Sequence, residues 1–130
     1  MATVLRLQHT SIPMPAGGEA AARAFFGGAL GMTEVAPPPE LHMLRIIWFK
    51  AGMDGHEIHL FTDDAMARNS SAQHICLEVD DFATFREKLS AADIEIEETI
   101  AIPSRPRCFV HDPFGNLIEL MQITGDHTAA

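Results

Sequence analysis

Four residues of the types that bind transition metals stand at related places in the two halves of this sequence. They are His9, His59, His74 and Glu119. His9 and His74 each open an apolar segment, and they lie 65 residues apart. His59 and Glu119 each stand between an Ile and a Leu, and they lie 60 residues apart. Self-similarity at a fixed spacing is typical of duplicated structural units. Three imidazoles and one carboxylate suit Zn, Ni, Fe, Mn or Co, whereas Ca and Mg prefer oxygen ligands.

The residues around each candidate ligand alternate as they do in a half-buried strand. Side chains at positions i and i+2 of a strand share a face. A strand that contains Glu119 therefore turns Ile118 and Leu120 to the opposite face, and the strand that contains His59 repeats the pattern. The sequence predicts that the aliphatic faces pack under helices while the ligands face a cavity.

The elements that position these ligands follow the same order twice. The predicted strands are Val4–Ile12, Thr33–Ala36, Leu44–Phe49, His56–Phe61, His74–Val79, Ile94–Glu98, Arg107–His111 and Leu117–Ile123. A helix is predicted over Glu19–Leu30, ended by Gly31, and a second helix follows an N-cap at Asp80 or Asp81. We therefore expect an α+β fold. Two βαβββ modules, about 4–62 and 72–124 of a single domain spanning 1–130, would form a curved, mostly antiparallel eight-stranded sheet around a metal cavity, with helices outside.

Composition restricts the partners of this chain. Its formal net charge of −9 disfavours nucleic acid and anionic membrane surfaces, which both attract clustered Lys and Arg. No apolar run is long enough to span a bilayer, and the N-terminus shows no signal peptide, so a cytoplasmic location is expected. The two cysteines, Cys76 and Cys108, form no paired motif and are predicted to be free thiols. A small-molecule partner fits this composition best.

Four segments of the chain resemble the vicinal oxygen chelate superfamily, which includes glyoxalase I, bleomycin- and fosfomycin-resistance proteins and extradiol dioxygenases. They are Leu7-Gln8-His9-Thr10-Ser11-Ile12, Glu57-Ile58-His59-Leu60, His74-Ile75-Cys76-Leu77-Glu78-Val79-Asp80-Asp81 and Asp112-Pro113-Phe114-Gly115-Asn116-Leu117-Ile118-Glu119-Leu120. The resemblance runs from about Leu5 to Ile123. It implies one divalent metal bound by His9, His59, His74 and Glu119, and it is consistent with the symmetric homodimer that uncovered strand edges also predict.

The resemblance implies a metal-dependent lyase or isomerase. In the shared chemistry of the superfamily, two neighbouring substrate oxygens chelate the metal, which stabilises an oxyanion or enediolate as a Lewis acid. Glu119 is then both a ligand and the candidate for proton transfer, because it is the only carboxylate among the four. Two alternatives stay open: a drug-binding protein of the bleomycin-resistance kind, and a small Fe(II) dioxygenase.

The chain departs from glyoxalase I at one ligand position, where His59 stands in place of Glu. A neutral imidazole there predicts a site more positive by one unit of charge and with one candidate base fewer. Five residues are predicted to bind substrate: Arg45, Phe49, Phe61, Arg107 and Phe109. The alternative for the two arginines is a structural ion pair with Glu57 or Glu78.

Overall fold

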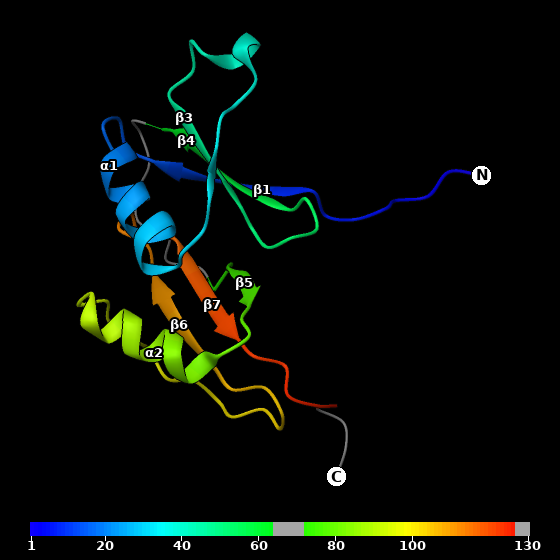
Figure 1. Cartoon of the computed structure of the whole chain (residues 1–130), viewed down its shortest axis with the longest axis vertical. Coiled ribbons are helices and arrows are strands. Elements are labelled where there is room, and N and C mark those ends of the chain that lie inside the picture. The colour runs from blue at the N-terminus through cyan, green and yellow to red at the C-terminus, as the bar shows by residue number, and fades with distance from the viewer. Residues whose placement is uncertain (64–71, 127–130) are drawn as a thin grey trace. The chain divides into compact units, whose positions relative to one another are not determined.

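A computed structural model describes residues 1–63 and 72–126 of the chain, which divides into two compact units, Met1–Met66 and Ala67–Ala130 (Figure 1). The division falls between the two predicted modules. Each unit contains one sheet and one long helical segment, and each is described by itself.

Unit 1 carries a four-stranded sheet in the order β1-β4-β3-β2. Its elements are β1 (His9–Met14), α1 (Glu19–Ala22), the π-helix η1 (Arg23–Ala29), β2 (Glu34–Val35), the 3-10 helix η2 (Pro39–Leu41), β3 (Ile46–Lys50) and β4 (Glu57–Thr62). Strands β1 and β4 are parallel, whereas the β2–β3 and β3–β4 pairs are antiparallel. Because β4 lies between β1 and β3, its side chains have neighbours from both.

The predicted helix over Glu19–Leu30 is confirmed, although most of its length is π-helical. At its end the backbone N–H of Leu30 donates to the carbonyl of Phe25, five residues earlier. Phe26 of this helix is fully buried, and its ring centroid lies 5.6 Å from that of Phe49 on β3. This contact packs the helix against one face of the sheet.

The predicted end of this helix at Gly31 is also confirmed, because Gly31 has a φ of +69°. A Cβ in this left-handed region costs about 1–2 kcal/mol. We therefore expect Gly31→Ala to lower the free energy of unfolding by about 1 kcal/mol in urea titrations. The control is Gly28→Ala inside η1, where the added Cβ meets only the Arg23 carbonyl at 3.9 Å. Equal effects of both substitutions would contradict the prediction.

Unit 2 carries a three-stranded sheet in the order β5-β7-β6. Its elements are β5 (Ile75–Glu78), α2 (Phe82–Ala91), β6 (Arg107–His111) and β7 (Leu117–Met121). The β5–β7 pair is parallel and the β6–β7 pair antiparallel, as in the corresponding strands of unit 1. Of the two predicted N-caps of α2, Asp81 is the one used: its carboxylate accepts from the backbone N–H of Thr84 at 3.1 Å and from its hydroxyl at 2.7 Å.

The predicted alternation of the last strand of each unit is confirmed. On β7, Ile118 and Leu120 are fully buried on the core side, with Glu119 between them on the other face. On β4, Ile58 and Leu60 flank His59 in the same way. Each of these two strands therefore carries one predicted metal ligand on the face away from the aliphatic core.

Most predicted strands are shorter by one or more residues in the structure, and two of them differ most. The first begins at His9 rather than Val4, because Val4–Leu7 are exposed and pair with no strand in the described part of unit 1 (Figure 1). The segment Ile94–Glu98 makes one isolated bridge, between Glu97 and Phe109. The described residues hold seven strands in two sheets, so the predicted single eight-stranded sheet is not confirmed. Within the described ranges, every helix is too short or too polar to cross a membrane.

Candidate functional site

Unit 1 brings two of the predicted ligands, His9 and His59, into direct contact. His9 opens β1 and His59 lies in the middle of β4, and their rings stack with centroids 4.1 Å apart. Trp48, which pairs with His59 across β3 and β4, stacks on the same imidazole at 3.8 Å with an interplanar angle of 2°. Since β4 lies between β1 and β3, the two faces of the His59 ring are covered by different neighbours.

Each of these histidines has one ring nitrogen engaged by an acceptor. His9 Nδ1 lies 2.7 Å from Gln8 Oε1, and the amide nitrogen of Gln8 donates to the Gly55 carbonyl. His59 Nε2 lies 2.8 Å from Glu57 Oε1. An imidazole that donates from one nitrogen keeps a lone pair on the other. Within the described part of unit 1, His9 Nε2 and His59 Nδ1 are therefore the nitrogens available to a metal.

Glu57 is ionised in this arrangement. The hydrogen bond from His59 holds the pKa of Glu57 below its usual range, against the opposing effect of partial burial. A further contact from Gln8 acts in the same direction. Unit 1 therefore places a negative charge beside the two imidazoles.

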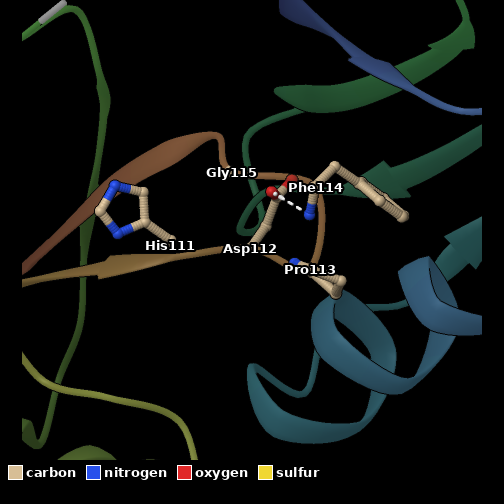
Figure 2. Close-up of a pocket in the computed structure, with 5 residues that line it drawn as sticks. All are labelled: His111, Asp112, Pro113, Phe114 and Gly115. Carbon is tan, nitrogen blue, oxygen red and sulfur yellow. Dashed lines mark hydrogen bonds between the residues drawn. The ribbon is translucent and has the colours of Figure 1, made fainter. Parts of the chain in front are cut away.

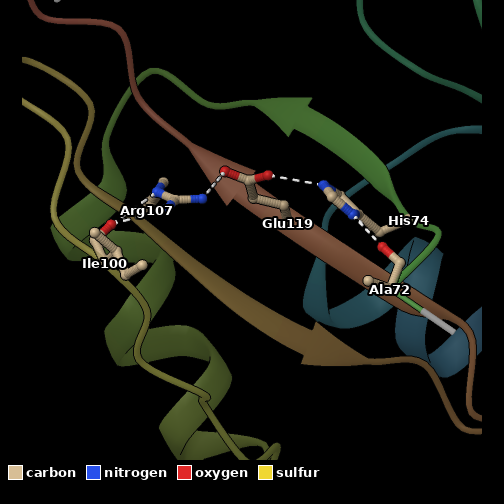
Figure 3. A network of polar contacts seen from close by, with 5 residues as sticks. All are labelled: Ala72, His74, Ile100, Arg107 and Glu119. Carbon is tan, nitrogen blue, oxygen red and sulfur yellow. Dashed lines mark hydrogen bonds and ion pairs between the residues drawn. The ribbon is translucent and has the colours of Figure 1, made fainter. Parts of the chain in front are cut away.

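Unit 2 brings together the other two predicted ligands, His74 and Glu119 (Figure 3). His74 Nε2 lies 3.0 Å from Glu119 Oε1, and His74 Nδ1 lies 2.8 Å from the Ala72 carbonyl. The carbonyl oxygen accepts only, so Nδ1 donates to it, and Nε2 is the nitrogen that faces the carboxylate. Phe109 stands edge-on to the imidazole, with centroids 4.9 Å apart.

Glu119 is nearly buried, and its second oxygen is held by Arg107. Arg107 Nη1 donates to Glu119 Oε2 at 3.1 Å, while Nε and Nη2 donate to the Ile100 carbonyl at 3.2 and 2.8 Å. The side chains of Arg107 and Glu119 are 14% and 6% exposed. A buried carboxylate needs such a partner to remain charged. The guanidinium therefore orients Glu119 with Oε1 towards His74 (Figure 3).

The two ligand pairs are equivalent in their strand registers. In the parallel β1–β4 pair, His9 lies opposite Glu57, two residues before His59. In the parallel β5–β7 pair, Ile75 lies opposite Ile118, so that His74, one residue earlier, corresponds to a place two residues before Glu119. The duplication inferred from the sequence thus extends to the hydrogen-bond register of the strands that carry the ligands.

Each unit by itself contains two of the four predicted ligands. Across residues 1–63 and 72–126, no cluster of three His, Cys, Asp or Glu side chains is placed to hold a metal. The four-ligand site stays a prediction. The donor set fits a transition metal: three imidazole nitrogens are oriented by fixed partners, and one carboxylate is held in place by a guanidinium.

The residues predicted to bind substrate have different environments. Arg45 is exposed and pairs with Glu19 at 3.2 Å, and Arg107 pairs with Glu119, so both make ion pairs, although not with Glu57 or Glu78. Phe61 is partly exposed near the end of β4. Phe109 contacts His74, as described above.

Phe49 lies in the core of unit 1, 1% exposed, on the face of β3 opposite Trp48. The aromatic residue of β3 that contacts a predicted ligand is therefore Trp48. Trp48 lies opposite His59 as Phe109 lies opposite Glu119, in equivalent strands. The alternation of the strand could have identified Trp48, because assigning Ile47 and Phe49 to the buried face puts Trp48 on the opposite face.

Cys76 lies opposite Glu119 in the β5–β7 pair. Burial of the sulfur, and next the charge of Glu119, raise the pKa of Cys76 to about 11. The thiol is therefore protonated at neutral pH, although the residue as a whole is exposed. A protonated thiol is a poor nucleophile.

A separate pocket lies at the hairpin between β6 and β7 and is lined by His111, Asp112, Pro113, Phe114 and Gly115 (Figure 2). Asp112 Oδ1 accepts from the backbone N–H groups of Phe114 and Asn116 at 2.9 and 2.8 Å, and Oδ2 accepts from the Asn116 amide at 2.7 Å. Burial raises the pKa of Asp112 against these bonds. The pocket includes none of the four predicted ligands, and its hydrogen bonds are those of a tight turn.

Comparisons with known proteins agree with this architecture. The family model of the Glyoxalase/Bleomycin resistance protein/Dioxygenase superfamily matches residues 6–120, and the chain belongs to that superfamily. A glyoxalase-family protein of Bacillus anthracis is 32% identical, with a TM-score of 0.85 over 95% of this chain and 98% of that one. No curated protein matches the chain.

More distant structures show the fold alone. A lactoylglutathione lyase of Agrobacterium tumefaciens is 23% identical, with a TM-score of 0.65 over 90% of this chain and 92% of that one. The fosfomycin resistance protein FosX of Listeria monocytogenes is 14% identical, with a TM-score of 0.70 over 99% of this chain and 100% of that one.

Proposed function

We propose that this protein is a metal-dependent enzyme that acts on a small oxygenated substrate, as a lyase or isomerase. His9, His59, His74 and Glu119 would hold one divalent transition metal. The observation that carries the proposal is the equivalence of the two ligand pairs: each lies at the same register of a parallel strand pair, with its donor atoms oriented by fixed neighbours. Members of this superfamily commonly use divalent metals.

The chain's own residues would orient the metal ligands and accept a proton from the substrate. The acceptors Gln8, Glu57 and the Ala72 carbonyl orient the three imidazoles, which lowers the cost of assembling the site. When bound, the metal would polarise two neighbouring substrate oxygens and stabilise the negative charge that develops on them. Glu119 would accept a proton from the substrate through a carboxylate whose orientation Arg107 fixes.

The experiment that tests this function is metal analysis of protein purified without chelator. We expect about one transition-metal ion per chain. A screen of the metal-loaded protein against α-ketoaldehydes, thioesters, epoxides and catechols should then identify a substrate class. Wild-type protein that binds no divalent metal near neutral pH would overturn the proposal. That result would instead favour a drug-binding protein, which needs no metal ligands.

We also propose that the protein works as a homodimer in the cytoplasm. Strands β1 and β5 are end strands of their sheets, so within each described unit one edge of each has no strand partner. Uncovered edges are normally paired or shielded. Sedimentation should therefore give about twice the chain mass of 14.2 kDa at micromolar concentration. A mass of one chain would contradict the dimer.

A further inference from the structure

We propose that the substrate of this protein carries an uncharged apolar group, about the size of an aromatic ring, which packs on an apolar strip of unit 1 beside the predicted ligand His59. The apolar strip consists of Pro13, Ile46, Trp48 and Phe61. This inference rests on the proposed function and names the chemical class of its substrate. Of these four residues, only Phe61 belongs to the set predicted from the sequence to bind substrate.

The strand register places the four residues of the apolar strip together on one face of the sheet. On the central strand β4, Phe61 is two residues from His59 and therefore shares its face. Phe61 lies opposite Pro13 on β1 and opposite Ile46 on β3. Trp48 lies opposite His59 itself, with ring centroids 3.8 Å apart. The apolar strip therefore begins at a predicted metal ligand and extends over three neighbouring strands.

The apolar strip departs from the alternation of a sheet that has one face in water. Such a sheet normally carries polar residues on the wet face and apolar residues on the other. On β3, however, Ile47 and Phe49 are 1% exposed in the core of unit 1, while Ile46 and Trp48 are half-buried on the other face. Phe61 on β4 is 37% exposed. Because apolar residues occupy both faces at this end of the sheet, we expect the apolar strip to be covered in the working protein.

Unit 2 shows that the strand arrangement does not require apolar residues at these positions. In the equivalent register of the β6–β7 pair, Arg107 stands where unit 1 has Ile46. In the β5–β7 pair, Glu78 stands where unit 1 has Pro13. The apolar strip is therefore a property of unit 1 and not a consequence of the duplicated fold.

A substrate group is the cover that fits both the place and the charge of the apolar strip. Protein packed permanently on it would also obstruct the approach to His59, which the proposed metal site requires to be reachable. The acidic and basic residues of β1, β3 and β4 on this face are Glu57 and Lys50, which lie opposite each other beyond His59. The apolar strip itself therefore offers no charge to an ionic group. Aromatic and aliphatic side chains are typical of surfaces that bind the apolar parts of small ligands, and a ring gains further from contact with the rings of Trp48 and Phe61.

Hydroxamates separate the contribution of the apolar group from that of the chelating group. Acetohydroxamate and benzohydroxamate present the same two neighbouring oxygens to a metal, and they differ only in carrying a methyl or a phenyl group. In calorimetric titrations of the Zn²⁺-loaded protein, corrected for binding to free Zn²⁺, we expect benzohydroxamate to bind about tenfold more tightly. We expect 4-carboxybenzohydroxamate to lose this gain. Equal affinities for the methyl and phenyl probes would overturn the inference and leave the proposed function intact.

Two substitutions within the apolar strip and one outside it locate the binding surface. Phe61→Ala should abolish most of the preference for the phenyl probe. Ile46→Arg, which gives unit 1 the residue type that unit 2 has at the equivalent place, should favour 4-carboxybenzohydroxamate over benzohydroxamate. The control is Met53→Ala, a fully exposed apolar residue between β3 and β4, which should keep the wild-type preference. Urea unfolding would establish that each variant is folded, and an unchanged phenyl preference in both strip variants would overturn the inference.

The last measurement requires no metal. In ¹H–¹⁵N spectra of the metal-free protein, acetophenone at millimolar concentration should shift the backbone amides of Ile46, Trp48 and Phe61, whereas benzoate at the same concentration should not. These shifts in a wild type that binds no Zn²⁺ would overturn the proposed function and leave the binding of an uncharged apolar group in place. Acetophenone that shifts none of the three amides, as expected if a second copy of the chain covers the apolar strip, would overturn the inference.

Discussion

Replacing His74 with Ala is expected to weaken Zn²⁺ binding by about a hundredfold or more. Four-ligand zinc sites contribute about 10–16 kcal/mol, or roughly 3 kcal/mol for each ligand. His74 offers Nε2 next to Glu119 Oε1, with its ring fixed by the Ala72 carbonyl, so its loss removes one donor and the partner of another. The fold should survive, because the side chain is 32% exposed.

The matched control for His74 is His111→Ala in the same unit. His111 is an imidazole of similar exposure that is also paired with a carboxylate, since its Nδ1 lies 3.2 Å from Glu97 Oε1. It is not among the predicted ligands, and its removal should leave Zn²⁺ affinity unchanged. A chelator-competition titration of both variants and the wild type measures these Zn²⁺ affinities. Equal affinities of His74→Ala and the wild type would remove His74 from the proposed site.

The second large effect is expected in catalysis: the metal-loaded protein should turn over the hemithioacetal of methylglyoxal and glutathione negligibly. A positioned general base contributes about 10²–10⁴-fold to a rate. The site has His59 where glyoxalase I has a carboxylate, and the nearby carboxylate of Glu57 is hydrogen-bonded to that imidazole. Only Glu119 then remains as a base among the four ligands.

The reciprocal substitution, His59→Glu, should recover this activity partially at best. His59→Gln is its control, because it offers an oxygen or nitrogen donor at the same place without a base. The activity of the wild type, His59→Glu and His59→Gln is measured by the absorbance of the thioester product. Robust isomerisation by the wild type would show that Glu119 alone can carry the proton and would contradict the argument from His59.

Local chemistry made much of the fold predictable. Alternation identified Ile118 and Leu120 as buried residues with Glu119 on the other face, and the structure confirms it. The helix that ends at Gly31 and the strand Arg107–His111 were equally visible, because a left-handed cap and a run of β-branched and aromatic residues depend on near neighbours. The family follows from the same local motifs.

Long-range contacts were less predictable. The segment Val4–Leu7 has the apolar residues of a strand, but a strand also needs a partner beside it. Phe49 carries an aromatic ring suited to a binding site, yet the packing of Phe26 turns it into the core. In both cases the deciding neighbour lies far away in the sequence, where pattern alone cannot place it.

The amino-acid sequence by itself determined the types and spacing of the four candidate ligands, because duplication and alternation are properties of the chain. Tertiary structure decided how each ligand is held. Glu57 engages His59 Nε2, the Ala72 carbonyl engages His74 Nδ1, and Arg107 binds Glu119 rather than Glu57 or Glu78. The physical reason is that hydrogen-bond geometry depends on the register between strands, which the folded backbone sets and the order of residues does not record.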